Sequence, residues 1–307
     1  MRRALALTSL VVALGSCAAA KKLSQGQMPT QQEMKQAVAT VKKIHSLSEE
    51  IRPDQEYYVG RAVATNILAK HDYRYLDKTA IARGELDGLT AYVNNVGQVV
   101  VAGAMEARRN GDRPAPVAGW HFTVVEGDSV NAFAAPGGYI FVTTAAVKTA
   151  KSEDELAAIL AHEVAHVMRG HALGSIKQSR YADVSSDLLS QAGTASLSPE
   201  QVAQLNKLME GIIDDTINAM FVKGYSRDTE FEADKLALEY MNKAGYDPAA
   251  LGRYLDSLAA KQETSKGGFY DTHPSTADRK SKLGGAVAMA VPKVRVTRFQ
   301  KEVGRLK

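Results

Sequence analysis

The clearest chemical signal in the sequence is the segment from His162 to His166, which reads H-E-V-A-H and fits the pattern H-E-x-x-H. Two histidines four residues apart on a helix project from one face, so both imidazoles can bind a single Zn²⁺. Glu163 points beside them, where it can hold a metal-bound water instead of the metal itself. Catalytic zinc usually takes three protein ligands, so this pair predicts a third ligand elsewhere in the chain.

One candidate for the third ligand is His171, shortly after the second histidine of the motif. The metzincin pattern H-E-x-x-H-x-x-G-x-x-H requires its Gly and its last His where this chain has Arg169 and Ala172. Gly170 and His171 each miss those places by one residue. We therefore interpret His171 as a residue at the helix C-terminus, favoured there by the helix dipole, and not as a ligand.

A second candidate lies in the segment 226–234, which reads S-R-D-T-E-F-E-A-D. Glu230 and Asp234 are four residues apart and share one face of a predicted helix. This spacing suits one carboxylate that binds a metal and another that orients a liganding imidazole. Glu232 points elsewhere on the helix and is expected in solvent. An acidic helix N-terminus stabilised by the helix dipole is the alternative explanation for these carboxylates.

Local signals predict the two helices that must position these residues. Ser152 and Glu155 form a capping box before an apolar stripe, which predicts a helix over 153–169. A second helix is predicted over about 226–244, and Gly245 follows it. Both motifs therefore lie on helices.

Two strands are predicted over 120–125 and 139–144, where apolar residues alternate or β-branched and aromatic residues gather. They flank the segment 131–138. Helices are also expected over 55–70 and 86–106, although the valine run inside the latter leaves a strand open there. The predicted fold class is α+β, with a small sheet packed on helices.

The two motifs together resemble the HtpX and CAAX-prenyl-protease family of zinc metallopeptidases. These are gluzincins, whose pattern is H-E-x-x-H followed by S-R-x-x-E-x-x-A-D. The resemblance implies a zincin-like metalloprotease domain, mainly helical, with one Zn²⁺ per chain. Carried over residue by residue, it makes His162, His166 and Glu230 the zinc ligands. It also makes Glu163 the general base and Asp234 the carboxylate behind a ligand.

The segment 131–138 reads N-A-F-A-A-P-G-G and is similar to the family segment N-A-F-x-x-P-G-G. In the family this segment is an edge strand beside the active-site cleft. The resemblance therefore makes Asn131, Ala132, Phe133 and Ala134 candidate substrate-binding residues. We expect an extended peptide to pair with this edge as an added β-strand. A buried turn between strands is the alternative.

The segment that starts at Thr272 reads T-H-P-S-T-A-D-R and resembles the family element T-H-P-x-x-x-x-R. Its His and Arg approach the metal site in the family, so His273 and Arg279 are candidate catalytic residues that stabilise the oxyanion. His273 has a second candidate role, in which it binds zinc in a resting state and excludes water. The alternative for His273 is an ordinary loop residue before a proline that starts a helix.

Composition limits the function classes. The 307 residues include 38 Lys and Arg against 34 Asp and Glu, a balance that gives no case for nucleic-acid binding. The chain has 1 Cys, so neither an intramolecular disulfide nor a cysteine-based metal site is expected. Any metal must be held by His and carboxylates.

The segment L-G-S-C that ends at Cys17 resembles a bacterial lipobox, in which the Cys is lipidated. We therefore expect a lipoprotein signal peptide at 1–16 and a tether with one helix at 17–50. The metallopeptidase domain is expected at 51–285 and a C-terminal tail at 286–307. Because no apolar run could cross a membrane, the resemblance points to the soluble lipoprotein branch of the family.

Two segments stay open. Residues 178–209 are rich in Ser, Ala and Gln and are a candidate lid. The C-terminal tail is either loose or a segment that docks through Val294, Val296 and Phe299.

The expected function is a zinc-dependent endopeptidase that hydrolyses unfolded or misassembled envelope proteins. Its expected partners are polypeptide substrates, a membrane reached through the lipid on Cys17, and outer-membrane protein assembly factors. The expected location is the bacterial cell envelope, on the outer membrane facing the periplasm. Two alternatives stay open: a non-catalytic zinc-containing chaperone or binding lipoprotein, and a processing enzyme that cuts one defined partner.

Overall fold

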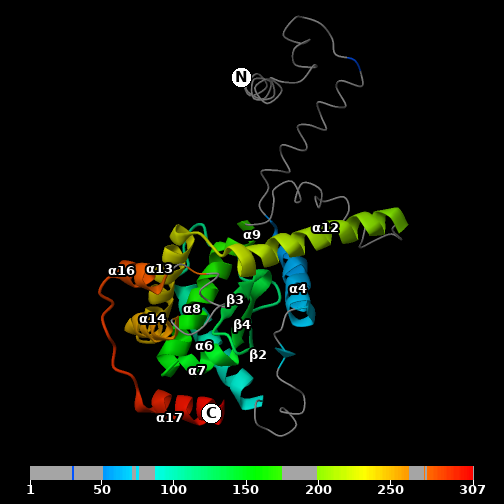
Figure 1. Cartoon of the computed structure of the whole chain (residues 1–307). Helices are drawn as coiled ribbons and strands as arrows, with labels where there is room; N and C mark the ends of the chain where they lie inside the picture. Colours follow the sequence, from blue (N-terminus) through cyan, green and yellow to red (C-terminus); the bar gives the residue numbers. More distant parts are fainter. Residues whose placement is uncertain are drawn as a thin grey trace, which may run out of the picture. The chain divides into compact units, whose positions relative to one another are not determined.

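The structure is a computed structural model that describes residues 30, 51–70, 74–75, 87–174, 199–262, 273 and 275–306 (Figure 1). The chain divides into two compact units, and both motifs lie in the unit made of Arg52–Ile176 and Met209–Lys307. The predicted signal peptide and Cys17 lie outside the described residues. So do almost all of the tether and much of the predicted lid.

Helices dominate the described part of the chain. They are α4 (Pro53–Lys70), α6 (Asp87–Glu106), α7 (Thr144–Thr149), α8 (Glu153–Arg169), α9 (His171–Gly174), α12 (Pro199–Asn218), η2 (Ala219–Lys223), α13 (Arg227–Lys243), α14 (Ala249–Gln262), α16 (Thr276–Lys282), α17 (Lys293–Val303) and η3 (Gly304–Leu306). The helices predicted over 55–70, 86–106 and 153–169 are confirmed. The valine run lies inside α6, so the strand left open there is wrong.

The sheet contains four described strands in the order β1-β2-β4-β3. They are β1 (Arg74–Tyr75), β2 (His121–Glu126), β4 (Tyr139–Thr143) and β3 (Ala132–Ala135). β2 and β4 are parallel, whereas β3 is antiparallel to β4. β3 is thus the last strand of the described sheet, in the segment for which the sequence predicts an edge strand. The fold is α+β, as predicted.

A tight turn, η1 (Pro136–Gly138), joins β3 to β4 and is held by α4. Gly137 has a φ of 75°, a backbone conformation that glycine adopts without strain. Its N–H donates to Glu56 Oε1 at 3.0 Å, and Arg113 Nη2 donates to the other oxygen of that carboxylate at 2.7 Å. A Cβ at Gly60 would lie only 2.1 Å from Pro136 O, so glycine lets α4 approach the turn this closely.

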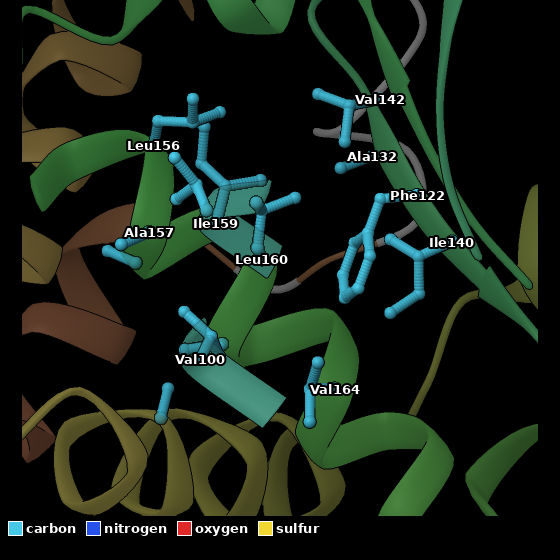
Figure 2. Packing of buried hydrophobic residues seen from close by; sticks show 14 of the residues in the cluster. Val100, Phe122, Ala132, Ile140, Val142, Leu156, Ala157, Ile159, Leu160 and Val164 are labelled. Atoms are coloured by element: carbon cyan, nitrogen blue, oxygen red, sulfur yellow. The ribbon is translucent and has the colours of Figure 1, made fainter. Parts of the chain in front are cut away.

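The core lies between α8 and the sheet. Figure 2 shows side chains from α8, among them Leu160 and Val164, facing Phe122 and Ile140 of the sheet, with Val100 of α6 close by. Helices α6, α13 and α14 also contact α8, so every residue from Glu153 to Met168 is buried. This central helix is the one that carries H-E-x-x-H.

Both ends of α8 are fixed by local interactions. Ser152 Oγ accepts a hydrogen bond from Glu155 N at 3.2 Å, which caps the first turn as predicted. Glu155 Oε2 accepts from Lys151 N at 2.9 Å, one residue before the Ser152 N–H that a full capping box would use. At the other end, Gly170 has a φ of 66° and a ψ of 31°, the left-handed geometry of a helix C-cap.

The C-terminal segment docks onto the domain from residue 293 onward. Phe299 and Val303 of α17 belong to the main apolar core. Arg298 Nε donates to Glu153 Oε2 at 2.7 Å, and Arg295 Nη1 donates to Asp154 Oδ1 at 3.0 Å. The acidic start of α8 is therefore paired with α17. A loose tail is wrong for this segment.

The docking alternative is correct for only part of its predicted surface. Phe299 is buried, whereas Val294 and Val296 are 64% and 41% exposed.

None of the helices in the described ranges is long and apolar enough to span a bilayer.

Candidate metal centre

The packing of α8 against α13 brings the two sequence motifs together. His162, His166, Glu230 and His273 each offer one ligand atom, and these atoms all lie within 4.8 Å of one another. His162 Nε2 is 3.0 Å from His166 Nε2 and 3.3 Å from Glu230 Oε2. His166 Nε2 is 3.4 Å from Glu230 Oε1. The structure therefore gathers the three sequence-predicted ligands, with His273 as a fourth donor.

His273 reaches this cluster from the loop before α16. Its Nδ1 lies 2.7 Å from Glu230 Oε2, and its side chain is almost fully buried. His273 thus lies beside the other donors, as the sequence resemblance implies.

The donor set fits a metal ion with His and carboxylate ligands. Atoms bound tetrahedrally at about 2.0–2.1 Å from zinc lie about 3.4 Å from one another. The separations of 3.3 and 3.4 Å between the imidazoles and Glu230 agree with this geometry. Glu230 Oε1 is buried and has no hydrogen-bond partner among the described residues. A bound cation would satisfy this oxygen.

Asp234 and Arg279 lie behind His162. Asp234 Oδ1 is 3.0 Å from His162 Nδ1, which leaves the Nε2 atom of the ring for the donor cluster. Arg279 pairs with both oxygens of Asp234, through Nη2 at 2.5 Å and Nε at 2.8 Å. The Arg279 side chain is 1% exposed. Asp234 is therefore placed to orient His162, and Arg279 of α16 is placed to fix Asp234.

Burial and neighbouring charge set the protonation of the buried carboxylates. Burial raises the pKa of Glu163 to about 7, against the opposing effect of His162. A carboxylate with such a pKa can both accept and return a proton near neutrality. Burial alone would also raise the pKa of Glu230, but the charges of His273 and His162 outweigh it and hold this pKa well below its usual range. Glu230 is therefore anionic.

The two imidazoles of the motif differ in basicity. Burial lowers the pKa of His166 to about 3, so the ring is neutral, the form in which histidine binds metals. Burial also acts to lower the pKa of His162, but the carboxylates of Glu230 and Asp234 outweigh it and raise this pKa to about 9.

A second group of side chains surrounds His166 and was not predicted from the sequence. The Tyr225 ring stacks on His166 with a centroid distance of 4.5 Å. His171 Nδ1 lies 2.9 Å from His166 Nδ1, and His171 Nε2 lies 3.4 Å from Glu232 Oε2. Glu232 is thus not simply solvated, because it contacts His171 and also accepts from Arg169 Nε at 2.8 Å.

The four candidate substrate-binding residues lie at one end of the sheet, and β3 contacts α8. All four are buried. Phe133 packs edge-on against Phe221, with ring centroids 4.7 Å apart. Asn131 precedes the strand, and its N–H donates to Thr143 Oγ1 at 3.0 Å. The side chains on both faces of the strand are thus buried, so β3 could offer a ligand only its backbone edge.

A helix bearing H-E-x-x-H, packed against a second helix that supplies a glutamate to the same cluster, defines the zincin class of metal-dependent hydrolases. Within this class the chain belongs to peptidase family M48, whose family pattern matches residues 91–287. This assignment is coarser than the resemblance to HtpX and the CAAX-prenyl proteases.

Several characterised proteins share this region. The chain is 32% identical to the beta-barrel assembly-enhancing protease of Yersinia pestis over 182 residues, which cover 56% of this chain and 33% of that protein. It is 33% identical to the mitochondrial metalloendopeptidase OMA1 of Schizosaccharomyces pombe over 166 residues, covering 53% of this chain and 45% of that protein. The chain thus spans less than half the length of either relative.

Proposed function

We propose that this chain is a zinc-dependent endopeptidase, with one Zn²⁺ held by His162, His166 and Glu230. The observation that carries the proposal is the buried donor cluster with Glu163 beside it. A structural zinc site needs no such carboxylate, and structural sites are normally closed and rich in Cys. Glu163 therefore favours catalysis over a zinc-containing chaperone or binding lipoprotein.

The roles of the residues follow from their positions. When bound, zinc supplies Lewis acidity that polarises a peptide carbonyl and acidifies water. Glu163 accepts the proton of the attacking water and returns it to the leaving amine. Asp234 and Arg279 support His162 from behind, and Arg279 Nη1 also lies 3.8 Å from Glu230 Oε2, close to the donor cluster. The proximity of His273 to Glu230 supports a role for His273 as a fourth zinc ligand in the resting enzyme.

An extended polypeptide is the proposed substrate, bound along β3. Thr143 N donates to Asn131 O at 2.9 Å, and β3 pairs with β4 in an antiparallel register. In an antiparallel pair, successive residues direct their backbone N–H and C=O alternately toward the partner strand and away from it. Asn131 bonds to β4, so Phe133, two residues later, also directs its N–H and C=O toward β4. Ala132 and Ala134 direct theirs toward the outer edge. A peptide could pair with this edge without a narrow sequence requirement.

The cellular setting is proposed on the same basis. A relative named for enhancing beta-barrel assembly supports unfolded or misassembled envelope proteins as substrates and assembly factors as partners. We propose a lipid anchor at Cys17 that holds the protein on the outer membrane, facing the periplasm. Membrane fractionation of a Cys17→Ala variant tests this location, and unchanged sedimentation with membranes would contradict a lipid anchor.

The decisive experiment separates metal binding from hydrolysis in the purified protein. Glu163→Gln should retain about one equivalent of zinc and lose casein hydrolysis by roughly 10²- to 10⁴-fold, because this residue acts on the water and not on the metal. Glu230→Ala should lose zinc as well, because it removes a ligand.

A Glu239→Gln variant is the control, since Glu239 pairs with Arg109 on the surface. Equal metal loss in Glu163→Gln and Glu230→Ala would contradict the assigned roles. Casein hydrolysis by Glu163→Gln at the wild-type rate would contradict the proposed function.

A further inference from the structure

The two motif histidines are both held from behind, but by different chemistry. Asp234 lies against His162 Nδ1, and an imidazole, His171, lies against His166 Nδ1 at 2.9 Å. In both rings the Nδ1 atom faces a supporting residue and the Nε2 atom faces the donor cluster. Histidine ligands commonly use one nitrogen for the metal and the other for such a partner.

The contacts behind His166 continue across the interface of α8 and α13. His171 Nε2 lies 3.4 Å from Glu232 Oε2, at hydrogen-bond distance. Glu232 Oε1 accepts from Arg169 Nε at 2.8 Å, and Arg169 Nη1 donates to Asp112 Oδ1 at 3.3 Å. The carboxylate of Glu232 is therefore itself fixed, although its side chain is 41% exposed.

The backbone at the end of α8 places His171 beside His166. The left-handed conformation of Gly170 ends α8 and turns the chain, so that His171 starts α9. A side chain at Gly170 would be strained by the positive φ, and its Cβ would lie 3.1 Å from Arg113 Cδ. This turn accounts for the contact between imidazoles five residues apart.

Only one simple arrangement of protons satisfies all of these contacts. If His166 uses the Nε2 lone pair for a metal, its Nδ1 carries the proton and donates to the Nδ1 lone pair of His171. His171 then carries its proton on Nε2 and donates to Glu232. The other tautomer of His171 would set two N–H groups against each other, and Glu232 Oε2 would lose the proton donated by His171.

We propose that His171 is a positioning residue for His166, and that Glu232 fixes the tautomer and ring orientation of His171. This inference rests on the proposed zinc site. Glu232, Glu230 and Asp234 thus form a set on α13, in which one carboxylate binds the metal and the others support the two histidines. His171 and Glu232 do not touch the metal or the substrate.

The test is the zinc affinity of the purified full chain, measured by competition with a chromogenic chelator. His171→Ala should weaken zinc binding by roughly 10- to 100-fold, the range for partners that support metal ligands. His171→Asn should recover part of this loss, because its carbonyl oxygen can take the place of Nδ1 and accept from His166. His171→Gln should not, since its carbonyl matches the position of Nε2.

A matched control is His121→Ala, because His121 stacks on Tyr139 and contacts Ala118 O, outside the donor cluster. If His171→Ala folds and binds zinc like the wild type, the proposal is overturned. If that variant does not fold, equal zinc affinities of the Asn and Gln variants overturn it instead. A wild-type protein that binds no zinc would refute the zinc site itself, so the two failures are distinguishable.

Discussion

At the residue scale, the site depends on buried charges that are each matched by a partner. Arg279 and Asp234 form a two-point pair with both side chains almost fully buried. Removing one member of such a pair leaves an uncompensated charge in a poorly solvated place. The pair therefore serves both to orient His162 and to keep α16 attached to α13.

We expect Asp234→Ala to lower the free energy of unfolding of the metal-free protein by about 3–5 kcal/mol, the cost of breaking a buried pair. Its control is Asp256→Ala, which breaks the exposed pair of Asp256 with Lys280 and should cost less than about 1 kcal/mol. Urea denaturation measures both. Similar losses in the two variants would show that the burial of the Asp234 pair has no special consequence.

His273 is the residue whose role is tested by a change in rate. If it is a fourth ligand at rest, His273→Ala opens a coordination position and should raise basal proteolysis of casein. Zinc should remain bound through the other three ligands. Steady-state kinetics with the zinc content measured in parallel checks this. A fall in kcat of roughly 10²-fold would instead assign His273 to oxyanion stabilisation.

At the element scale, β3 presents two kinds of backbone group. The backbone N–H and C=O of Phe133 form hydrogen bonds with β4, whereas those of Ala134 face the outer edge of the sheet. Proline lacks an N–H, so its effect depends on which side of the strand it faces. Phe133→Pro would disturb the sheet itself and is a poor test of substrate binding.

Ala134→Pro removes an outward N–H only. We expect it to raise KM for an unstructured peptide several-fold or to abolish turnover, with zinc content unchanged. Ala134→Gly keeps the N–H and serves as the control. Peptide kinetics on folded protein, checked by circular dichroism, provide the measurement. Intact kinetics in Ala134→Pro would favour a purely structural role for β3.

The helices and the candidate ligands His162 and His166 could be predicted from the sequence because their signals are local. Ser152 caps α8, and a spacing of four residues puts His162 and His166 on one face. The contact of His171 with His166 could not be predicted in this way, since it depends on the turn at Gly170. The partner Glu232 comes from another helix, and only the packing of α8 against α13 brings it there.

At the scale of the whole molecule, the C-terminal helix is part of the folded domain. Phe299 lies in the core, and the arginines of α17 pair with the buried start of α8. The sequence allowed docking but did not identify the partners, because the acidic first turn of α8 has its own explanation in the helix dipole. The C-terminal helix α17 is thus joined to α8 by direct contacts.

Phe299→Ala should therefore lower the free energy of unfolding by about 3–5 kcal/mol, as for other buried aromatic side chains. Val294→Ala on the same helix should change it by less than about 0.5 kcal/mol, since Val294 is largely exposed. Denaturant unfolding followed by fluorescence measures both. Equal effects would mean that α17 is not held by the core.

The division of labour between α8 and α13 has a geometric consequence. α8 supplies His162 and His166, His171 follows at the start of α9, and α13 supplies the carboxylates at positions 230, 232 and 234. A shift of α13 by a single residue would move it 1.5 Å along its axis and 100° around it, taking all three carboxylates from their partners at once. Apolar ridges often permit more than one setting of two helices, but these polar contacts are satisfied in only one. The polar contacts of the metal centre thus fix the register of α13 against α8.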